Sequence, residues 1–127
     1  MRRGALTEFA RNEADGKDRR RVPRFPFKAS AEITEAESGK KTNATTSDLS
    51  LYGCYVRMQD PPPRGAQVLI KIHTESDFFE GHATVAFSQA GVGIGLSFHD
   101  VHPYFLPTLK KWLAEAMKAM TKIEHPD

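Results

Sequence analysis

Two short polar stretches of this sequence carry residue types that could recognise a small anionic molecule. Residues 19–24 include four arginines, and residues 48–53 combine a carboxylate, a hydroxyl and a glycine. An arginine presents a planar fork of donors that suits phosphate oxygens or the acceptor edge of guanine. A carboxylate can accept two hydrogen bonds from the donor edge of guanine. Together the two stretches could hold a small, doubly charged molecule with purine edges.

Each stretch also has a simpler interpretation. Four basic residues alone could form a solvated basic patch or a general nucleic-acid anchor. Residues 48–53 could form an Asx turn, in which Asp48 and Ser50 bond their own backbone and Gly53 adopts a positive φ. The four basic residues are all arginine and none is lysine, which favours bidentate recognition over a plain basic patch.

The elements that must position these residues are predicted from the apolar pattern. Alternating apolar and polar residues predict six strands. The predicted strands span residues 27–34, 41–47, 51–56, 68–72, 79–88 and 92–98. On this pattern Phe87 and Val92 face the core. Six short strands separated by turn signals are typical of a small antiparallel barrel or sandwich.

The last part of the chain changes to a helical period. Its apolar face is predicted to carry Leu106, Leu109, Leu113, Ala116, Met117 and Met120. Trp112 flanks this face, and Asp100 or His102 could open the helix. We therefore expect a mostly β fold, a six-stranded antiparallel β-barrel with a C-terminal α-helix that closes one end.

The first two predicted strands should form a hairpin that turns at Ser38 and Gly39. Antiparallel pairing then sets residues 48–53 opposite roughly residues 24–29. The two polar stretches would lie side by side, and this expectation depends on strand register alone.

Length and composition limit the remaining possibilities. The 127 residues allow one domain: a flexible arm at residues 1–18, a barrel and helix at 19–121 and a tail at 122–127. Leu6, Phe9 and Ala10 could instead form a short docking helix. A net charge of +2 makes nucleic acid an unexpected partner. A single cysteine and the lack of a long apolar run predict a cytoplasmic protein without a membrane span.

No set of residues in the sequence predicts catalysis. Ser50 and Asp48 have no histidine placed by sequence to act as a base. His99 and His102 could seat a metal ion only as a lone pair. We therefore expect no enzyme activity, no resident metal and no cofactor.

The polar residues also resemble a known family. Arg20-x-x-x-Arg24 followed by Asp48-x-Ser50-x-x-Gly53 resembles the paired signature of the PilZ domain, the bacterial receptor module for cyclic di-GMP. Residues 93–98 are similar to the family's late-strand pattern, and the resemblance covers about residues 19–120. It implies a six-stranded antiparallel barrel without catalysis, in which the two arginines bind guanine and phosphate and the aspartate and serine hold guanine.

The resemblance implies a single-domain cyclic di-GMP receptor that relays the signal to a protein partner through ordering of its arginine loop. The ligand-binding residues that it implies are Arg19, Arg20, Arg24, Asp48, Ser50 and Gly53. An arginine at position 19 is associated in the family with an intercalated ligand dimer, because its guanidinium can stack on an exposed guanine face. The alternative is a PilZ-fold interaction protein that binds no nucleotide and acts through protein contacts or its basic arm.

Overall fold

The structure is a computed structural model that describes residues 23–124. The predicted arm at residues 1–18 and the arginines at 19–21 lie outside the described residues. The elements are β1 (Phe25–Pro26), β2 (Ser30–Glu35), β3 (Lys41–Leu49), β4 (Gly53–Arg57), β5 (Gln67–His73), β6 (Phe78–Gln89), β7 (Gly93–Asp100), the 3-10 helix η1 (Pro103–Phe105) and α3 (Leu106–Glu124). The helix thus continues three residues into the predicted tail at 122–127.

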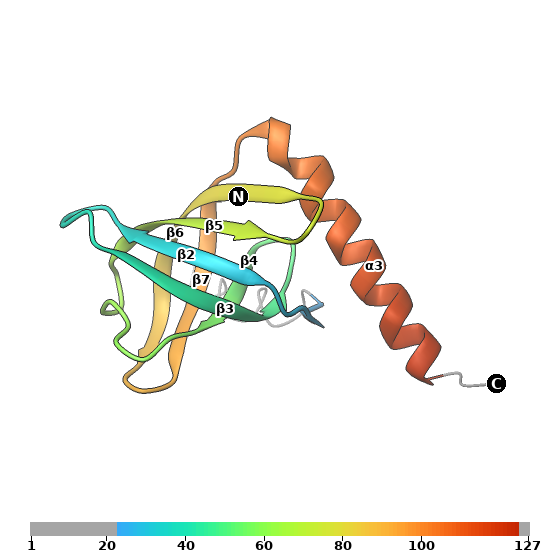
Figure 1. The fold of residues 1–127 in the computed structure, drawn as a ribbon, viewed down its shortest axis with the longest axis horizontal. Coiled ribbons are helices and arrows are strands. Elements are labelled where there is room, and N and C mark those ends of the chain that lie inside the picture. The colour runs from blue at the N-terminus through green and yellow to red at the C-terminus, as the bar shows by residue number, and fades with distance from the viewer. Residues whose placement is uncertain (1–22, 125–127) are drawn as a thin grey trace, which may run out of the picture.

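Six of the strands close into an antiparallel barrel (Figure 1). Neighbouring strands follow the order β3-β2-β5-β6-β7-β4, and pairing between β3 and β4 closes the ring. The two-residue β1 pairs with the C-terminal end of β3, at Asp48 and Leu49. The predicted fold, a six-stranded antiparallel barrel with one C-terminal helix, is confirmed.

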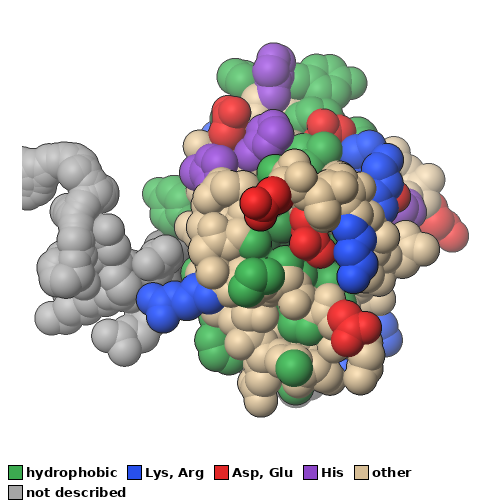
Figure 2. Space-filling model, turned by 90° about the vertical axis from the view of Figure 1, so that its left-hand side faces the viewer, with side chains coloured by type: hydrophobic (Ala, Val, Ile, Leu, Met, Phe, Trp, Pro, Cys, Tyr) green, Lys and Arg blue, Asp and Glu red, His purple; other side chains and the backbone are tan. Residues whose placement is uncertain are grey.

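The outer surface of the barrel is polar and of mixed charge on the face that Figure 2 shows. Acidic and basic side chains lie interspersed there rather than gathered by sign. Charges of opposite sign close together cancel at a distance, so this face does not attract a polyanion strongly. Of the described helices, none is both long and apolar enough to cross a membrane.

The predicted hairpin of β2 and β3 is present, with a register offset by about two residues from the predicted one. Thr34 pairs with Lys41 and Ser30 with Thr45, and β1 continues the pairing with Pro26 opposite Asp48. Between β1 and β2 the chain leaves the ladder, and the buried Thr46 bridges the gap. Its hydroxyl donates to the Phe27 carbonyl at 2.6 Å and accepts from the Ala29 amide at 2.9 Å. The residues that follow Pro26 are therefore held against β3.

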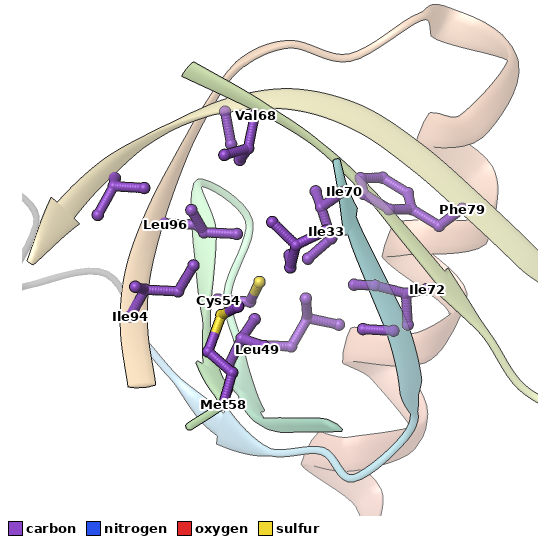
Figure 3. Packing of buried hydrophobic residues seen from close by; sticks show 14 of the residues in the cluster. Ile33, Leu49, Cys54, Met58, Val68, Ile70, Ile72, Phe79, Ile94 and Leu96 are labelled. Carbon is purple, nitrogen blue, oxygen red and sulfur yellow. The ribbon is translucent and has the colours of Figure 1, made fainter. Parts of the chain in front are cut away.

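The core lies inside the barrel and receives side chains from every strand of the ring (Figure 3). Its largest fully buried aliphatic side chains on the strands are Ile33, Leu49, Ile70, Ile72, Ile94, Val56, Val68 and Val85, and Leu109 of α3 joins them. Most are β-branched residues, which pack well on a pleated surface. The period-two pattern therefore identified the inward-facing residues correctly in most parts of the strands.

The pattern was wrong at three positions. Leu51 was predicted to begin the third strand, but it lies in the bend before β4, which begins only at Gly53. Val92 lies in the turn before β7 and is exposed. Phe87 points outward because the register of β6 shifts between Val85 and this residue. The extra residue of a β-bulge reverses the alternation of all that follow it.

The helix is anchored by Trp112, which was predicted to lie only at the edge of the apolar face. This side chain is fully buried, and its ring lies 5.0 Å from the ring of Phe27 and 6.3 Å from that of Phe79. Met117, which was predicted to lie on the buried face, is 51% exposed. The helix is therefore turned about its axis, so that its buried face is centred closer to Trp112 than predicted.

A salt bridge fixes the same helix to the turn between β5 and β6. Lys111 Nζ lies 2.8 Å from Asp77 Oδ2. The hydrogen bond from Lys111 holds the pKa of Asp77 below its usual value, and the same bond raises the pKa of Lys111. Both groups are exposed to solvent, so the bridge orients the helix more than it stabilises it.

Replacing Trp112 with alanine should lower the free energy of unfolding by about 3–5 kcal/mol, the usual cost of removing a large buried ring. Met117→Ala on the same helix should change it by no more than about 0.5 kcal/mol, because its side chain is largely exposed. Urea denaturation followed by circular dichroism measures both, since Trp112 is the only tryptophan and its fluorescence is lost in the variant. Equal losses in the two variants would contradict this view of the helix.

Candidate functional site

A cavity of about 560 Å³ opens on the outer surface of the barrel, over β4, β6 and β7 and beside the start of β1. Its lining residues are Arg24, Ser50, Tyr52, Gly53, Tyr55, Ala86, Phe87, Gly95, Leu96 and Ser97. They come from segments far apart in the sequence, which the antiparallel pairing of β4 with β7 and of β7 with β6 brings together.

Arg24 stands at the mouth of this cavity, immediately before β1. Its side chain is 48% exposed, and its Nη1 lies 3.5 Å from Oδ1 of Asp48. This length is at the upper limit for a hydrogen bond, and exposed pairs contribute little to stability. The guanidinium is therefore held near the cavity but keeps donors that an anionic ligand could use.

Asp48 is positioned by an irregularity in the pairing of β3 with β4. The register shifts between Thr46 and Asp48, and Oδ1 of Asp48 accepts a hydrogen bond from the backbone amide of Tyr55 at 3.1 Å. The carboxylate thus satisfies an amide at the point where the ladder is interrupted. Within residues 23–124, its Oδ2 forms no hydrogen bond. One oxygen supports the strand, and the other is unbonded within the described part of the chain.

The bend at residues 50–53 is held from within. The hydroxyl of Ser50 donates to the Gly53 carbonyl and accepts from the Tyr52 amide, both at 3.2 Å. The simpler interpretation of this stretch is therefore right for Ser50. It is wrong for Asp48, which bonds an amide seven residues away.

Gly53 is needed for a different reason from the one predicted. Its φ is not among the positive values found in the described part of the chain. A Cβ at this position would instead overlap the carbonyl oxygen of Leu96 on the neighbouring strand. Gly53 thus permits β4 and β7 to approach closely at the edge of the cavity.

The structure brings together part of the predicted site. Arg24, Ser50 and Gly53 line the cavity, and Asp48 lies at its edge through its contact with Arg24. Arg19 and Arg20 lie outside the described residues. Two aromatic residues of the lining, Tyr55 and Phe87, were not among the predicted ligand-binding residues. The alternation of the third predicted strand already indicates that Tyr55 points outward. Phe87 points outward because of a bulge, which the period of the sequence does not reveal.

The chemistry of the cavity suits binding. Among the described residues, its lining includes no histidine, cysteine or carboxylate. Cys54, which lies behind the lining, is fully buried; burial raises the pKa of its thiol far above the usual range, and the charge of Asp48 raises it further while that of Arg24 lowers it. The thiol therefore stays protonated and is not a nucleophile.

The histidine pair considered for a metal ion is occupied by other contacts. His99 Nε2 lies 2.9 Å from Gln67 Oε1, and Nδ1 of His102 accepts from the Tyr104 amide. Across residues 23–124, no group of three or more histidine, cysteine or acidic side chains is arranged to hold a metal.

Comparison with known proteins gives one family. A model described as "PilZ domain" matches residues 18–115. Comparison with curated protein sequences gives no match.

Solved structures of similar shape come from several bacteria. The PilZ domain of CeSA from a cellulose-synthesizing bacterium superposes with a TM-score of 0.57 at 20% identity, covering 77% of this chain and 98% of that one. The PilZ domain of YcgR from Escherichia coli, solved with c-di-GMP, has a TM-score of 0.65 at 14% sequence identity, and the match covers 86% of this chain and 98% of that one. The PlzA protein of Borreliella burgdorferi in complex with c-di-GMP has a TM-score of 0.55 at 16% sequence identity, and the match covers 76% of this chain and 42% of that one. At these identities the likeness establishes the fold.

The close approach at Gly53 can be tested by stability alone. Gly53→Ala should lower the free energy of unfolding by at least about 1–3 kcal/mol, because the new methyl group collides with backbone that cannot move aside. Gly95→Ala is the matched control, since a Cβ there would make only ordinary contacts at 3.6 Å and beyond. Urea denaturation of both variants would refute the steric explanation if their midpoints agreed.

Proposed function

This chain belongs to the PilZ domain family, and from that premise we propose that it is a receptor for cyclic di-GMP which binds its ligand in the cavity beside Arg24. Two structural neighbours were solved with c-di-GMP, which supports this choice of ligand. In this proposal the protein performs no catalysis and acts in the cytoplasm.

The observation that carries the proposal is the meeting of the two sequence motifs at one cavity. Arg24 and Asp48 are 24 residues apart in the chain and lie in contact at its mouth. Guanine presents acceptors on one edge and donors on another, so a guanidinium and a carboxylate can read both. Asp48 has an oxygen to offer, and Arg24 has the remaining donors of its fork.

Arg20 can reach the same place. It precedes Arg24 by four positions, and an extended chain spans about 3.3–3.6 Å per residue. A phosphate in the cavity could therefore be bound by both arginines. Arg19 would add a guanidinium face on which a second ligand molecule could stack.

The relay to a partner would follow from fixing the arginine loop. Holding residues 17–24 against the barrel costs about 1–2 kcal/mol of conformational free energy per residue. Charge-assisted hydrogen bonds to the ligand, each worth about 1.5–3 kcal/mol, can offset that cost. Binding would change the surface beside β1, and a protein partner could read that change.

Arg20→Ala and Arg24→Ala should each weaken binding of cyclic di-GMP roughly tenfold or more, because each removes at least one charge-assisted bond. Arg64→Ala, which removes an exposed arginine from the connection between β4 and β5, is the charge-matched control and should bind like the wild type. Isothermal titration calorimetry measures all four proteins. The site would be wrongly placed if both motif variants kept wild-type affinity. If the wild type gave no saturable heat at micromolar protein, the alternative of a PilZ-fold interaction protein would replace the proposal.

Asp48 should govern the choice of base. Asp48→Asn keeps an acceptor oxygen for the Tyr55 amide and should bind more weakly, while Asp48→Ala should lose much of the preference for guanine over adenine. Competition between cyclic di-GMP and its adenine counterpart, measured for each variant, tests this role. Unchanged discrimination in Asp48→Ala would exclude it.

A further inference from the structure

Two aromatic rings form one wall of the cavity, and neither belongs to the paired motifs. Tyr55 on β4 and Phe87 on β6 both pair with Gly95 of β7, from its two sides. Their ring centroids lie 6.4 Å apart, with the planes inclined by 36°. The glycine between them has no side chain and is itself buried, so the surface at this place is formed by the two rings. We call Tyr55, Gly95 and Phe87 the aromatic shelf.

The shelf exists because of the bulge in β6. Val85 pairs with Leu96 and Phe87 with Gly95, so two steps along β6 correspond to one step along β7. Ala86 is the additional residue. In a regular strand without this bulge, Phe87 would lie two paired positions after Val85 and would point into the core as Val85 does. The bulge instead leaves this phenyl ring 50% exposed in the cavity lining. Bulges commonly redirect a side chain beside a functional site.

The outward faces of the two rings are accessible to a flat partner, since Phe87 is exposed and Tyr55 is half-buried. A Cβ added at Gly95 would lie 3.6 Å from Cβ of Phe87 and 3.8 Å from Cδ1 of Tyr55. Gly95 itself is buried, so the rings and not the strand backbone form the surface here. Arg24 lines the same cavity, so a molecule lying on the rings would also be within the field of a cation.

We propose that the aromatic shelf is a stacking platform for one purine base of the ligand. This inference rests on the proposed function. A base between two parallel rings would need about 7 Å, two contacts of about 3.5 Å each. The rings are closer than that and inclined, so the base lies across their outward faces. Every base has a π face, and stacking on aromatic side chains is correspondingly tolerant of base identity.

The shelf and the motif residues would therefore divide the work of recognition. Arg24 and Asp48 act on the edges of a base, in its plane, and decide which base is accepted. Tyr55 and Phe87 act on the face of a base and contribute affinity whichever purine is present. Cyclic di-GMP has two bases, so edge and face contacts could be made to both.

The test compares Phe87 variants with a phenylalanine of similar exposure on the same strand. Phe87→Ala and Phe87→Leu should each weaken binding of cyclic di-GMP on the order of tenfold, because neither retains a π face. Phe87→Trp should keep or improve affinity. Phe78→Ala is the control, since Phe78 is 45% exposed but lies outside the cavity. Calorimetry gives the affinities, and urea denaturation verifies that each variant is folded.

Two further measurements distinguish stacking from simple packing. In the Phe87→Trp variant, saturating cyclic di-GMP should quench the fluorescence of the added indole, with the single native tryptophan, buried Trp112, as the reference signal in the wild type. Phe87→Ala should also lose affinity for cyclic di-GMP and for its adenine counterpart by the same factor. Wild-type affinity in a folded Phe87→Ala protein, or an unquenched indole, would overturn the shelf while leaving the proposed function intact. Absence of binding by the wild type would overturn both.

Discussion

The register between β1 and β3 is the constraint on which the candidate site depends. Pro26 lies opposite Asp48, so the residue two positions earlier, Arg24, emerges beside the end of β3. A slip of one residue would turn every side chain of the strand to the other face. Thr46 opposes such a slip, because its buried hydroxyl bonds the chain on both sides of the gap between β1 and β2. The closed barrel fixes the other strands around this pairing.

Two interruptions of the ladder border the cavity, and each places a side chain that a regular strand could not. The shift after Thr46 leaves the Tyr55 amide to be satisfied by Asp48, which orients that carboxylate. The shift after Val85 turns Phe87 outward. In both places the strand pairing is irregular beside the cavity, and such irregularities are common next to functional sites.

Much of this arrangement could be predicted from the sequence, because most strands alternate without a break. The hairpin and the meeting of the two polar stretches followed from the period and from the turn that includes Gly39, which has a positive φ. The observed pairing is nevertheless offset by about two residues from the predicted register. What could not be predicted depends on contacts between strands. A bulge at Ala86 and the overlap avoided at Gly53 are invisible to periodicity, and the burial of Trp112 is decided by Phe27 and Phe79. Arg19 and Arg20 lie outside the described residues and stay predictions.

The state of the polar groups explains why this cavity would exchange its internal contacts for a ligand. The pair of Arg24 and Asp48 is long and exposed, and such a pair is worth about 0–1 kcal/mol. Charge-assisted bonds to phosphate or guanine are worth about 1.5–3 kcal/mol each, so replacing this pair with ligand contacts favours the complex. The Ser50 hydroxyl, by contrast, is buried and bonded to its own bend. It keeps the bend in shape, and breaking its bonds would leave buried groups unsatisfied. The site is therefore rigid where it is buried and exchangeable where it is exposed.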